Sequence, residues 1–447
     1  MQVTRQQNAL QAADPDIRQQ NMKRIFREIG FVGMLMTTLS DFYFPGVGLP
    51  IVTMVGTAVF VCFSLLWPRP NDPVSRIRRR NTTTMAILLL GAYLVSAIWG
   101  VALFKTGSIK GALGMGLGTM ILVAMLYQED NVEFRRTVAT FYTRLLVIHL
   151  VFWAFQAAVS IASGSFLDYI LPITGVPTRH GISVEGVETR LDRYSGLYVE
   201  PAIYATNIYF FLTARLISSR LRLRFLDILA MATIVGSLSL TGILLVVFLV
   251  LLCLVKAVKD WRAALAALGV VAGLAGVAIS VSNTDIMAVV VTRLNAPSAD
   301  PSGRIRTVDA LDSYLRLPEA AQLFGIGVGN TDVVDKVSNG MLDILISYGI
   351  LGVAGIAALF VAMLRQRRVS PLLWVFIIAM LPGGTYFTIQ GWWLWVGMMA
   401  LASPAAVSVA KLEDLVDSCG TRDYGSGNGG SPVDAATTGS LLGQEPI

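Results

Sequence analysis

The chain has 447 residues, of which 54% are hydrophobic and only 14% are charged, and its net charge is +6. A soluble globular protein carries about 25% charged residues, so this composition excludes a multi-domain soluble protein. Recurring apolar runs of the ~20 residues that cross a bilayer predict an all-α polytopic membrane protein. In such a chain the basic residues serve topology and anionic lipid headgroups, and we expect no nucleic-acid partner.

From the N-terminus, residues 1–28 are polar and Gln-rich and predict a cytoplasmic segment. Twelve candidate spans follow, at about 29–45, 49–67, 83–104, 111–127, 139–163, 199–217, 226–240, 242–258, 264–282, 339–363, 371–387 and 389–409. The seventh and eighth spans form one long apolar run broken at Thr241-Gly242. This run is either a tight hairpin or a single bent helix, so eleven spans is the alternative.

The orientation follows from the positive-inside rule, which assigns the basic loops to the cytoplasm. These loops hold Arg76, Arg78, Arg79 and Arg80, then Arg135 and Arg136, Arg220, Arg222 and Arg224, Lys256, Lys259 and Arg262, and Arg365, Arg367 and Arg368. The chain therefore divides into a cytoplasmic segment (1–28), spans one to five (29–163), a large external loop (164–198), spans six to nine (199–282), a second external loop (283–338), spans ten to twelve (339–410) and a disordered cytoplasmic tail (411–447).

The two external loops concentrate basic residues on the side where topology disfavours them. The first holds Arg179, Arg190 and Arg193, and the second holds Arg293, Arg304, Arg306, Arg316 and Lys336. Both loops exceed the ~12–15 residues that simple connections need. Guanidinium groups are permanently charged and bind phosphate oxygens in pairs, so the pattern predicts a phosphate-bearing ligand. The alternative is a solvated loop whose arginines pair with Asp168, Glu185, Glu188 or Asp192.

Two carboxylates stand at the membrane ends of these loops. Glu200 precedes Pro201, which suits the first turn of a helix, and its role is either structural, at the helix dipole, or that of a general base. Asp343 lies one turn inside a span, where an acid usually faces a polar cavity. Ser338 or Asn339 is expected to cap that span. The Gly-rich run Gly325–Asp332 lacks the following Gly-Lys-Ser/Thr of a P-loop.

Other polar residues predict structural roles. Arg144 and Asp227 are expected to extend from the cytoplasmic ends of their spans toward water. Helix packing is the expected role of three small hydroxyl residues, Ser237, Ser239 and Thr241. Three cysteines (Cys62, Cys253 and Cys419) and two histidines (His149 and His180) show no metal or disulfide pattern, so we expect no metal and no cofactor.

Four motifs together resemble the bacterial O-antigen ligase and Wzy-type polysaccharide polymerase superfamily over about residues 185–360. The first runs from Arg193 through Tyr-Ser-Gly-Leu-Tyr-Val to Glu200-Pro201. The others are Ser237-Leu-Ser-Leu-Thr241-Gly242, with Leu240 in place of an arginine, then Ser302-Gly303-Arg304 with Ala310-Leu311 and Gly325–Asn330, and finally Asn339 and Leu342 with Tyr348-Gly349-Ile350-Leu351-Gly352. Ligases carry a histidine where Ser338 stands here, and this departure favours a polymerase.

The resemblance implies a metal-independent, inverting, GT-C-like glycosyltransferase in the bacterial inner membrane, with two periplasmic loops and both termini cytoplasmic. It would transfer a growing glycan from undecaprenyl pyrophosphate to another lipid-linked unit, for O-antigen, capsule or exopolysaccharide synthesis, and a chain-length regulator is a candidate partner. The catalytic residues would be Glu200 as base, with Arg193 and Arg304 neutralising the leaving group. The substrate-binding residues would be Arg190, Arg306, Tyr194, Asn339 and Asp343.

Three alternatives remain open. A ligase would transfer finished polysaccharide to another acceptor. A transporter or flippase would need charges lining a path through the bundle, and few ionisable residues lie in mid-span. A membrane O-acyltransferase would use an intramembrane histidine such as His149, but on an apolar helix we expect this residue to be packed in the core.

Overall fold

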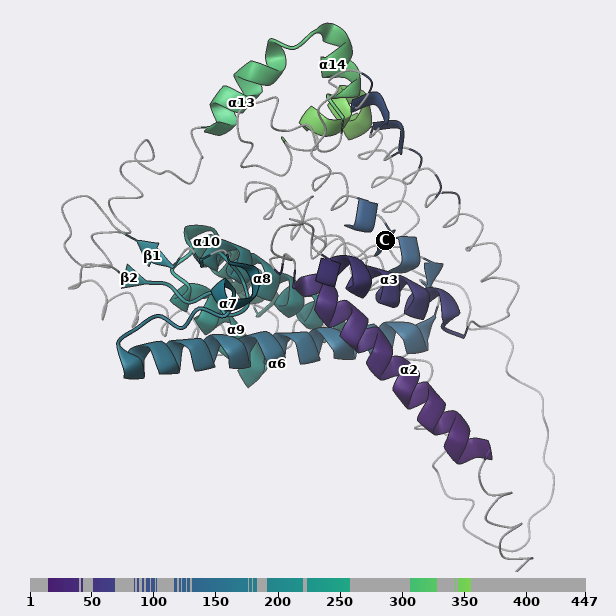
Figure 1. Cartoon of the computed structure of the whole chain (residues 1–447), viewed down its shortest axis with the longest axis vertical. Helices are drawn as coiled ribbons and strands as arrows, with labels where there is room; N and C mark the ends of the chain where they lie inside the picture. Colours follow the sequence, from purple (N-terminus) through teal and green to yellow (C-terminus); the bar gives the residue numbers. More distant parts are fainter. Residues whose placement is uncertain are drawn as a thin grey trace, which may run out of the picture. The chain divides into compact units, whose positions relative to one another are not determined.

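The computed structural model describes residues 15–39, 42, 51–68, 131–175, 177–178, 180–182, 191–219, 223–257, 306–327, 342 and 345–354, together with isolated positions between 84 and 128 (Figure 1). These residues are almost entirely helical. The helices are α2 (Pro15–Thr38), α3 (Ile51–Leu66), α6 (Val132–Ser163), α7 (Leu171–Thr174), α8 (Pro201–Ser218), α9 (Phe225–Gly236), α10 (Leu240–Ala257), α13 (Arg306–Leu315) and α14 (Glu319–Phe324). Two two-residue strands, β1 (Gly181–Ile182) and β2 (Leu191–Asp192), pair antiparallel with Gly181 opposite Asp192.

The prediction of a helical chain is confirmed for these residues, and helices occur where the first, second, fifth, sixth, seventh and eighth spans are expected. Within the described part of the chain, α6 is the one helix that is both long and apolar enough to cross a membrane. The number of spans stays a prediction. The spans at 264–282, 371–387 and 389–409 and the tail at 411–447 lie outside the described residues.

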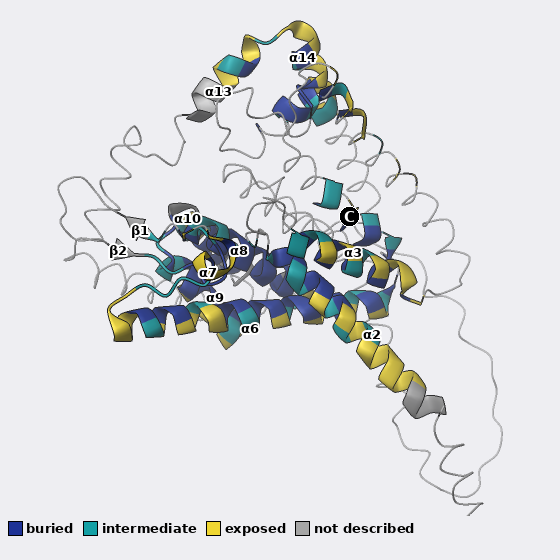
Figure 2. Ribbon diagram, in the orientation of Figure 1, coloured by how far each residue is buried: buried dark blue, intermediate teal, exposed yellow. Residues whose placement is uncertain are grey.

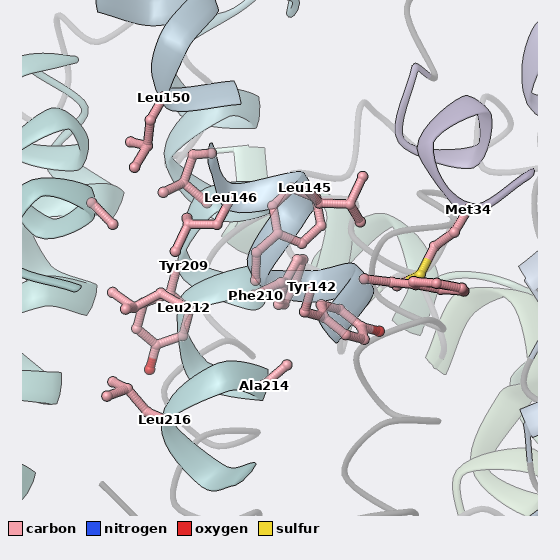
Figure 3. Packing of buried hydrophobic residues seen from close by; sticks show 14 of the residues in the cluster. Met34, Tyr142, Leu145, Leu146, Leu150, Tyr209, Phe210, Leu212, Ala214 and Leu216 are labelled. Atoms are coloured by element: carbon pink, nitrogen blue, oxygen red, sulfur yellow. The ribbon is translucent and has the colours of Figure 1, made fainter. Parts of the chain in front are cut away.

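The core is built around α8, which contacts α6, α9 and α10 (Figure 1). Every described α8 side chain from Tyr204 to Leu216 is buried, so α8 is the central helix of this core. Figure 3 shows this packing, in which α6 and α8 interdigitate through Tyr142, Leu145, Leu146, Leu150, Tyr209, Phe210 and Leu212.

The predicted break between the seventh and eighth spans is wrong by a few residues. The helices separate at Ser237–Ser239, where Leu238 has a φ of 50°, and not at Thr241-Gly242. Ser239 sets the boundary because its Oγ accepts a hydrogen bond from the Gly242 backbone N at 3.3 Å, which caps α10. Gly242 serves close packing instead, since a Cβ there would lie 2.7 Å from the Cβ of Ala205 on α8.

The exposed side chains of α6, which Figure 2 colours yellow, change from polar to apolar along the helix. Its first half exposes the polar side chains Glu133, Arg136, Thr140 and Arg144. From Val147 to Ala162 the exposed side chains are all apolar, namely Val147, Val151, Phe152, Ala154, Phe155, Ala158, Ile161 and Ala162. At 1.5 Å per residue this apolar stretch is about 24 Å long.

Helix α2 also changes along its length, from exposed polar and charged side chains to buried ones, near its ion pair with α6. The residues from Gln19 to Arg27 are exposed except for Phe26, and they include three basic side chains, whereas buried positions begin at Gly30. The two transitions are joined by an ion pair, in which Arg144 of α6 donates to Glu28 of α2 at 2.8 Å. Both helices thus run from a charged end to an apolar end in the same direction.

Candidate functional site

Residues 193–200, which carry the first family-like motif, lie against α6. The Trp153 Nε1 donates a hydrogen bond to the backbone O of Tyr194 at 3.1 Å. The Oε1 of Gln156 accepts hydrogen bonds from the backbone N of Ser195 at 3.0 Å and of Gly196 at 2.8 Å. Two α6 side chains therefore satisfy three backbone groups of an irregular segment that has no helix or sheet partner for them.

The middle of this segment is a buried turn and not an open loop. Ser195 and Tyr198 are fully buried, and the Ser195 Oγ donates to the Tyr198 O at 2.6 Å. Gly196 has a φ of 56°, and a Cβ there would lie 3.5 Å from the Trp153 backbone N. The side chains at the two ends of the turn, Arg193 and Glu200, remain half-exposed.

Tyr198 reaches a buried histidine in the core. The His149 ring stacks between Tyr198 and Phe211 at centroid distances of 5.2 and 5.5 Å, and His149 is fully buried. Its Nε2 lies 3.2 Å from the Thr38 Oγ1 and 3.5 Å from the Tyr198 hydroxyl. The prediction that His149 is a packed core residue is confirmed.

Arg193 is held by the strand pair that precedes the turn. Its backbone N and its Nε both donate to the His180 O, at 3.0 and 3.4 Å. The His180 ring stacks on Phe166 at 3.8 Å, and Phe166 also stacks on Tyr194 at 6.2 Å. Arg193 directly follows β2, and Arg190 lies outside the described residues.

Glu200 occupies the position immediately before α8. Its backbone O accepts the first helical hydrogen bond, from the Tyr204 N at 3.1 Å. The prediction that Pro201 begins this helix is confirmed. The side chain of Glu200 is thereby held at the N-terminal end of α8.

Asp168 organises the loop that leads to the turn, a role that sequence reasoning missed. Its carboxylate accepts hydrogen bonds from the backbone N of Ile170, Leu171 and Thr178 and from the Thr178 hydroxyl, at 2.7 to 3.0 Å. Burial disfavours the charged form, but these four hydrogen bonds outweigh it and lower the pKa of Asp168. The sequence reading had considered this carboxylate only as a partner for arginine.

The glycine-rich motif of the second loop packs backbone against backbone. The N of Ile326 donates to the Ile346 O at 2.8 Å, and the N of Gly327 donates to the Ser347 O at 3.1 Å. Gly349 has a φ of 67°, and a Cβ there would lie 2.3 Å from the Leu323 O. The motifs around 325–327 and 348–352, distinct in sequence, thus meet because Gly325 and Gly349 have no Cβ where the two backbones approach.

A helix from the third predicted span completes this contact. The Trp99 Nε1 donates to the Gly325 O at 3.1 Å, and the Ser96 Oγ donates to the Ser347 O at 3.0 Å. Nearby, Tyr314 of α13 and Ala321 of α14 bury against Ile326. Close packing therefore explains why glycines stand at positions 325, 327 and 349.

The remaining predicted site residues are not placed. Arg306 begins α13, but its side chain lies outside the described residues, as do Arg304, Asn339 and Asp343. The structure therefore brings together Arg193, Tyr194 and Glu200 on one short segment and leaves the contribution of the second loop a prediction. In the described part of the chain no group of three or more His, Cys, Asp or Glu side chains could hold a metal ion.

A buried ion pair at the far end of α8 corrects one prediction. Asp227 does not extend toward water. It is fully buried, and it accepts a hydrogen bond from the Arg215 Nε at 2.6 Å and from the Arg224 backbone N at 2.7 Å. A sequence signal was available, because Arg215 in the last turn of α8 and Asp227 in the first turn of α9 flank a short connection between helices.

Comparison with known proteins assigns no family. No protein-family model matches the chain, and no curated protein matches it. The function is accordingly argued from the motifs and from the geometry of the described residues.

Proposed function

We propose that this protein is a membrane-embedded glycosyltransferase that polymerises lipid-linked polysaccharide repeat units at the periplasmic face of a bacterial inner membrane. It would have about twelve spans and a GT-C-like architecture. The observation that carries the proposal is the 193–200 segment, in which α6 fixes the backbone between a half-exposed guanidinium and a half-exposed carboxylate. A rigid support for both charges is what proximity and electrostatic catalysis require.

The membrane location is supported by the change of surface along α2 and α6. Exposed apolar side chains over about 24 Å of α6 match most of a ~30 Å hydrocarbon core. In water, such a face would be a large unpartnered apolar patch. The charged ends of both helices belong to the side that the positive-inside rule assigns to the cytoplasm.

The reaction would be a single displacement at the anomeric carbon of the donor sugar. The acceptor hydroxyl oxygen attacks that carbon, and Glu200 takes the hydroxyl proton. The bond between the anomeric carbon and the pyrophosphate oxygen breaks, and the bonding electrons leave with undecaprenyl pyrophosphate, so the configuration inverts. Arg193 and Arg304 would neutralise the negative charge that develops on the leaving group.

The other predicted residues would bind substrate around this centre. Arg190 and Arg306 would supply further charge to the diphosphate. Tyr194, whose ring lies beside Trp153 and Phe166, would contact a sugar next to Arg193. Asn339 and Asp343 would bind sugar hydroxyls at the start of the tenth span.

Glycan length on the lipid carrier tests the proposal. Deletion of the gene should leave single repeat units on the carrier, and the Glu200→Gln and Arg193→Ala variants should do the same while inserting normally into the membrane. Matched controls are Glu319→Gln and Arg27→Ala, because both side chains are exposed and neither belongs to the predicted site. The controls should give normal polymer.

Other outcomes separate the alternatives. Normal-length polysaccharide from both site variants would rule out the assigned roles. Long polymer retained on the carrier after deletion would indicate a ligase. Repeat units trapped at the cytoplasmic face would indicate a flippase.

A further inference from the structure

The 193–200 segment contacts α6 at mid-height of its apolar face. The α6 residues that touch it are His149, Trp153 and Gln156. All three lie between Val147 and Ala162, the stretch whose exposed side chains are entirely apolar. The site segment is therefore level with the part of α6 that is suited to lipid and not with its polar end.

The rise per residue of an α-helix gives the depth of the 193–200 segment in the bilayer. Measured from Ser163, the last residue of α6, Gln156 lies about 10 Å and Trp153 about 15 Å along the helix. The hydrocarbon core is about 30 Å thick. If the apolar face of α6 spans that core, the turn at Ser195-Gly196 lies roughly a third of the way across it.

The chain on both sides of the turn agrees with this depth. After Gly164 the chain doubles back along α6, because the Leu167 N donates to the Ser160 Oγ at 2.9 Å and the Gln156 Nε2 donates to the Leu167 O at 2.8 Å. Helix α8 then starts at Pro201, and it rises only about 21 Å before it reaches Arg215 near its cytoplasmic end. A helix that begins at the outer surface would need about 30 Å.

We infer that residues 193–200 form an irregular segment inside the depth of the bilayer that leads directly into α8, with Gln156 as its positioning residue. Irregular backbone is tolerated at that depth only when protein groups satisfy it. Gln156 does so for two N–H groups and for the Leu167 carbonyl, and Trp153 does so for the Tyr194 carbonyl. The inference rests on the membrane location in the proposed function but not on the reaction.

The consequence concerns the substrate class. A polar head group must descend below the outer interface to reach Arg193 and Glu200, and an amphiphile anchored in the membrane can bring its head group there along the lipid phase. A water-soluble sugar nucleotide has no such anchor. The segment therefore favours a lipid-linked diphosphate as the donor.

Spin-label depth measurements on α6 test the inference in the full-length protein reconstituted in lipid bilayers. Cys62, Cys253 and Cys419 are first replaced by alanine, and single labels are then placed on exposed positions, at Arg136, Val151, Phe155 and Ile161. The spin relaxation of labels at 151 and 155 should be accelerated mainly by oxygen and not by the aqueous nickel chelate. The spin relaxation of the label at 136 should show the reverse. If 151 and 155 are accessible to the chelate as 136 is, the end of α6 stands in water and the inference is overturned.

The role of Gln156 in positioning the turn can be tested by a rate of maleimide labelling, which does not depend on activity. In a Leu197→Cys background, an impermeant maleimide should react slowly. The Gln156→Ala variant should react about tenfold faster, because the turn loses its hydrogen bonds. The matched control is Gln128→Ala, since Gln128 is also buried and also binds backbone carbonyls, those of Ser64 and Trp67. Equal rates in the two variants would remove Gln156 from this role.

These results are distinct from a failure of the proposed function. Deep labels at 151 and 155 with normal polymer from Glu200→Gln would keep the segment inside the bilayer and reject the catalytic assignment. As a check on folding, all variants should elute as the parent does in gel filtration.

Discussion

The turn at 194–198 and the glycine segment at 325–327 are both irregular chain packed on a helix, but they are held in different ways. The first is fixed by side chains that reach from α6, chiefly Gln156 and Trp153. The second accepts one indole hydrogen bond, from the Trp99 Nε1 to the Gly325 O, but it is otherwise fixed by direct contact between backbones, which Gly349 permits.

The two ways of holding the chain suit the two segments to different tasks. The first segment keeps Arg193 and Glu200 half-exposed while its middle is buried, so it can present charge to a ligand. In the second, Gly325, Ile326 and Gly327 are all buried, and the segment joins neighbouring parts of the chain. The comparison predicts that the first region depends on polar pairing in buried places and that the second depends on atomic size.

The largest effect is expected from the buried ion pair of α8 and α9. Asp227→Leu leaves the Arg215 charge buried without its partner and should destabilise the protein by about 3–5 kcal/mol. The double variant Arg215→Met/Asp227→Leu should recover most of that loss, because it buries neither charge. Thermal unfolding of the purified protein in detergent measures both. A double variant as unstable as the single one would show that the pairing does not matter.

Gly349→Ala tests the glycine region. The new Cβ would meet the Leu323 O at 2.3 Å in a left-handed backbone conformation, and we expect a loss of about 2–4 kcal/mol. Gly91→Ala is the matched control, because a Cβ there has nothing within 4 Å. The same thermal assay should leave the control unchanged or slightly stabilised. Equal losses from both substitutions would contradict the close-packing explanation.

A smaller effect is expected from Asp168, which holds the loop before the turn. Asp168→Asn should cost on the order of 1 kcal/mol at neutral pH. Because hydrogen bonds lower the pKa of the folded-state carboxylate, its contribution is present above the unfolded value of 3.8 and is lost as the pH falls through the folded value. The difference in Tm between the parent and the variant should therefore shrink below about pH 4. A constant difference would show that charge plays no part.

The smallest effect is expected from the exposed pair of Glu28 and Arg144. Their side chains are 47% and 43% exposed, and such pairs contribute roughly 0–1 kcal/mol. Glu28→Gln should shift the Tm by no more than about 2 °C in moderate salt. A loss as large as that of Asp227→Leu would mean that burial does not decide the strength of polar pairing here.

The helices themselves were predictable, because apolar runs of span length can be read directly from the sequence. The start of α8 at Pro201 and the burial of His149 follow from local chemistry, and both are confirmed. The contacts of the site segment could not be predicted in the same way. Gln156 and Ser195 are far apart in the chain, and no local pattern marks an amide side chain as the acceptor for a distant turn.

Two errors have the same origin. The position of Asp227 in its own span predicts that it reaches water, whereas its partner is on the preceding helix. The apolar run is predicted to break at Thr241-Gly242, but a serine cap sets the boundary and Gly242 faces Ala205 of α8. Neither contact with α8 can be read from a local pattern.

Gln156 binds the chain where it leaves α6, at Leu167, and where it returns, at Ser195 and Gly196. One amide thus fixes the base of the loop where the chain leaves α6 and where it returns. Under the proposed function, sequence changes in this loop that keep Asp168, Arg190, Arg193 and Tyr194 should alter which glycan is recognised and leave Arg193 and Glu200 where they are.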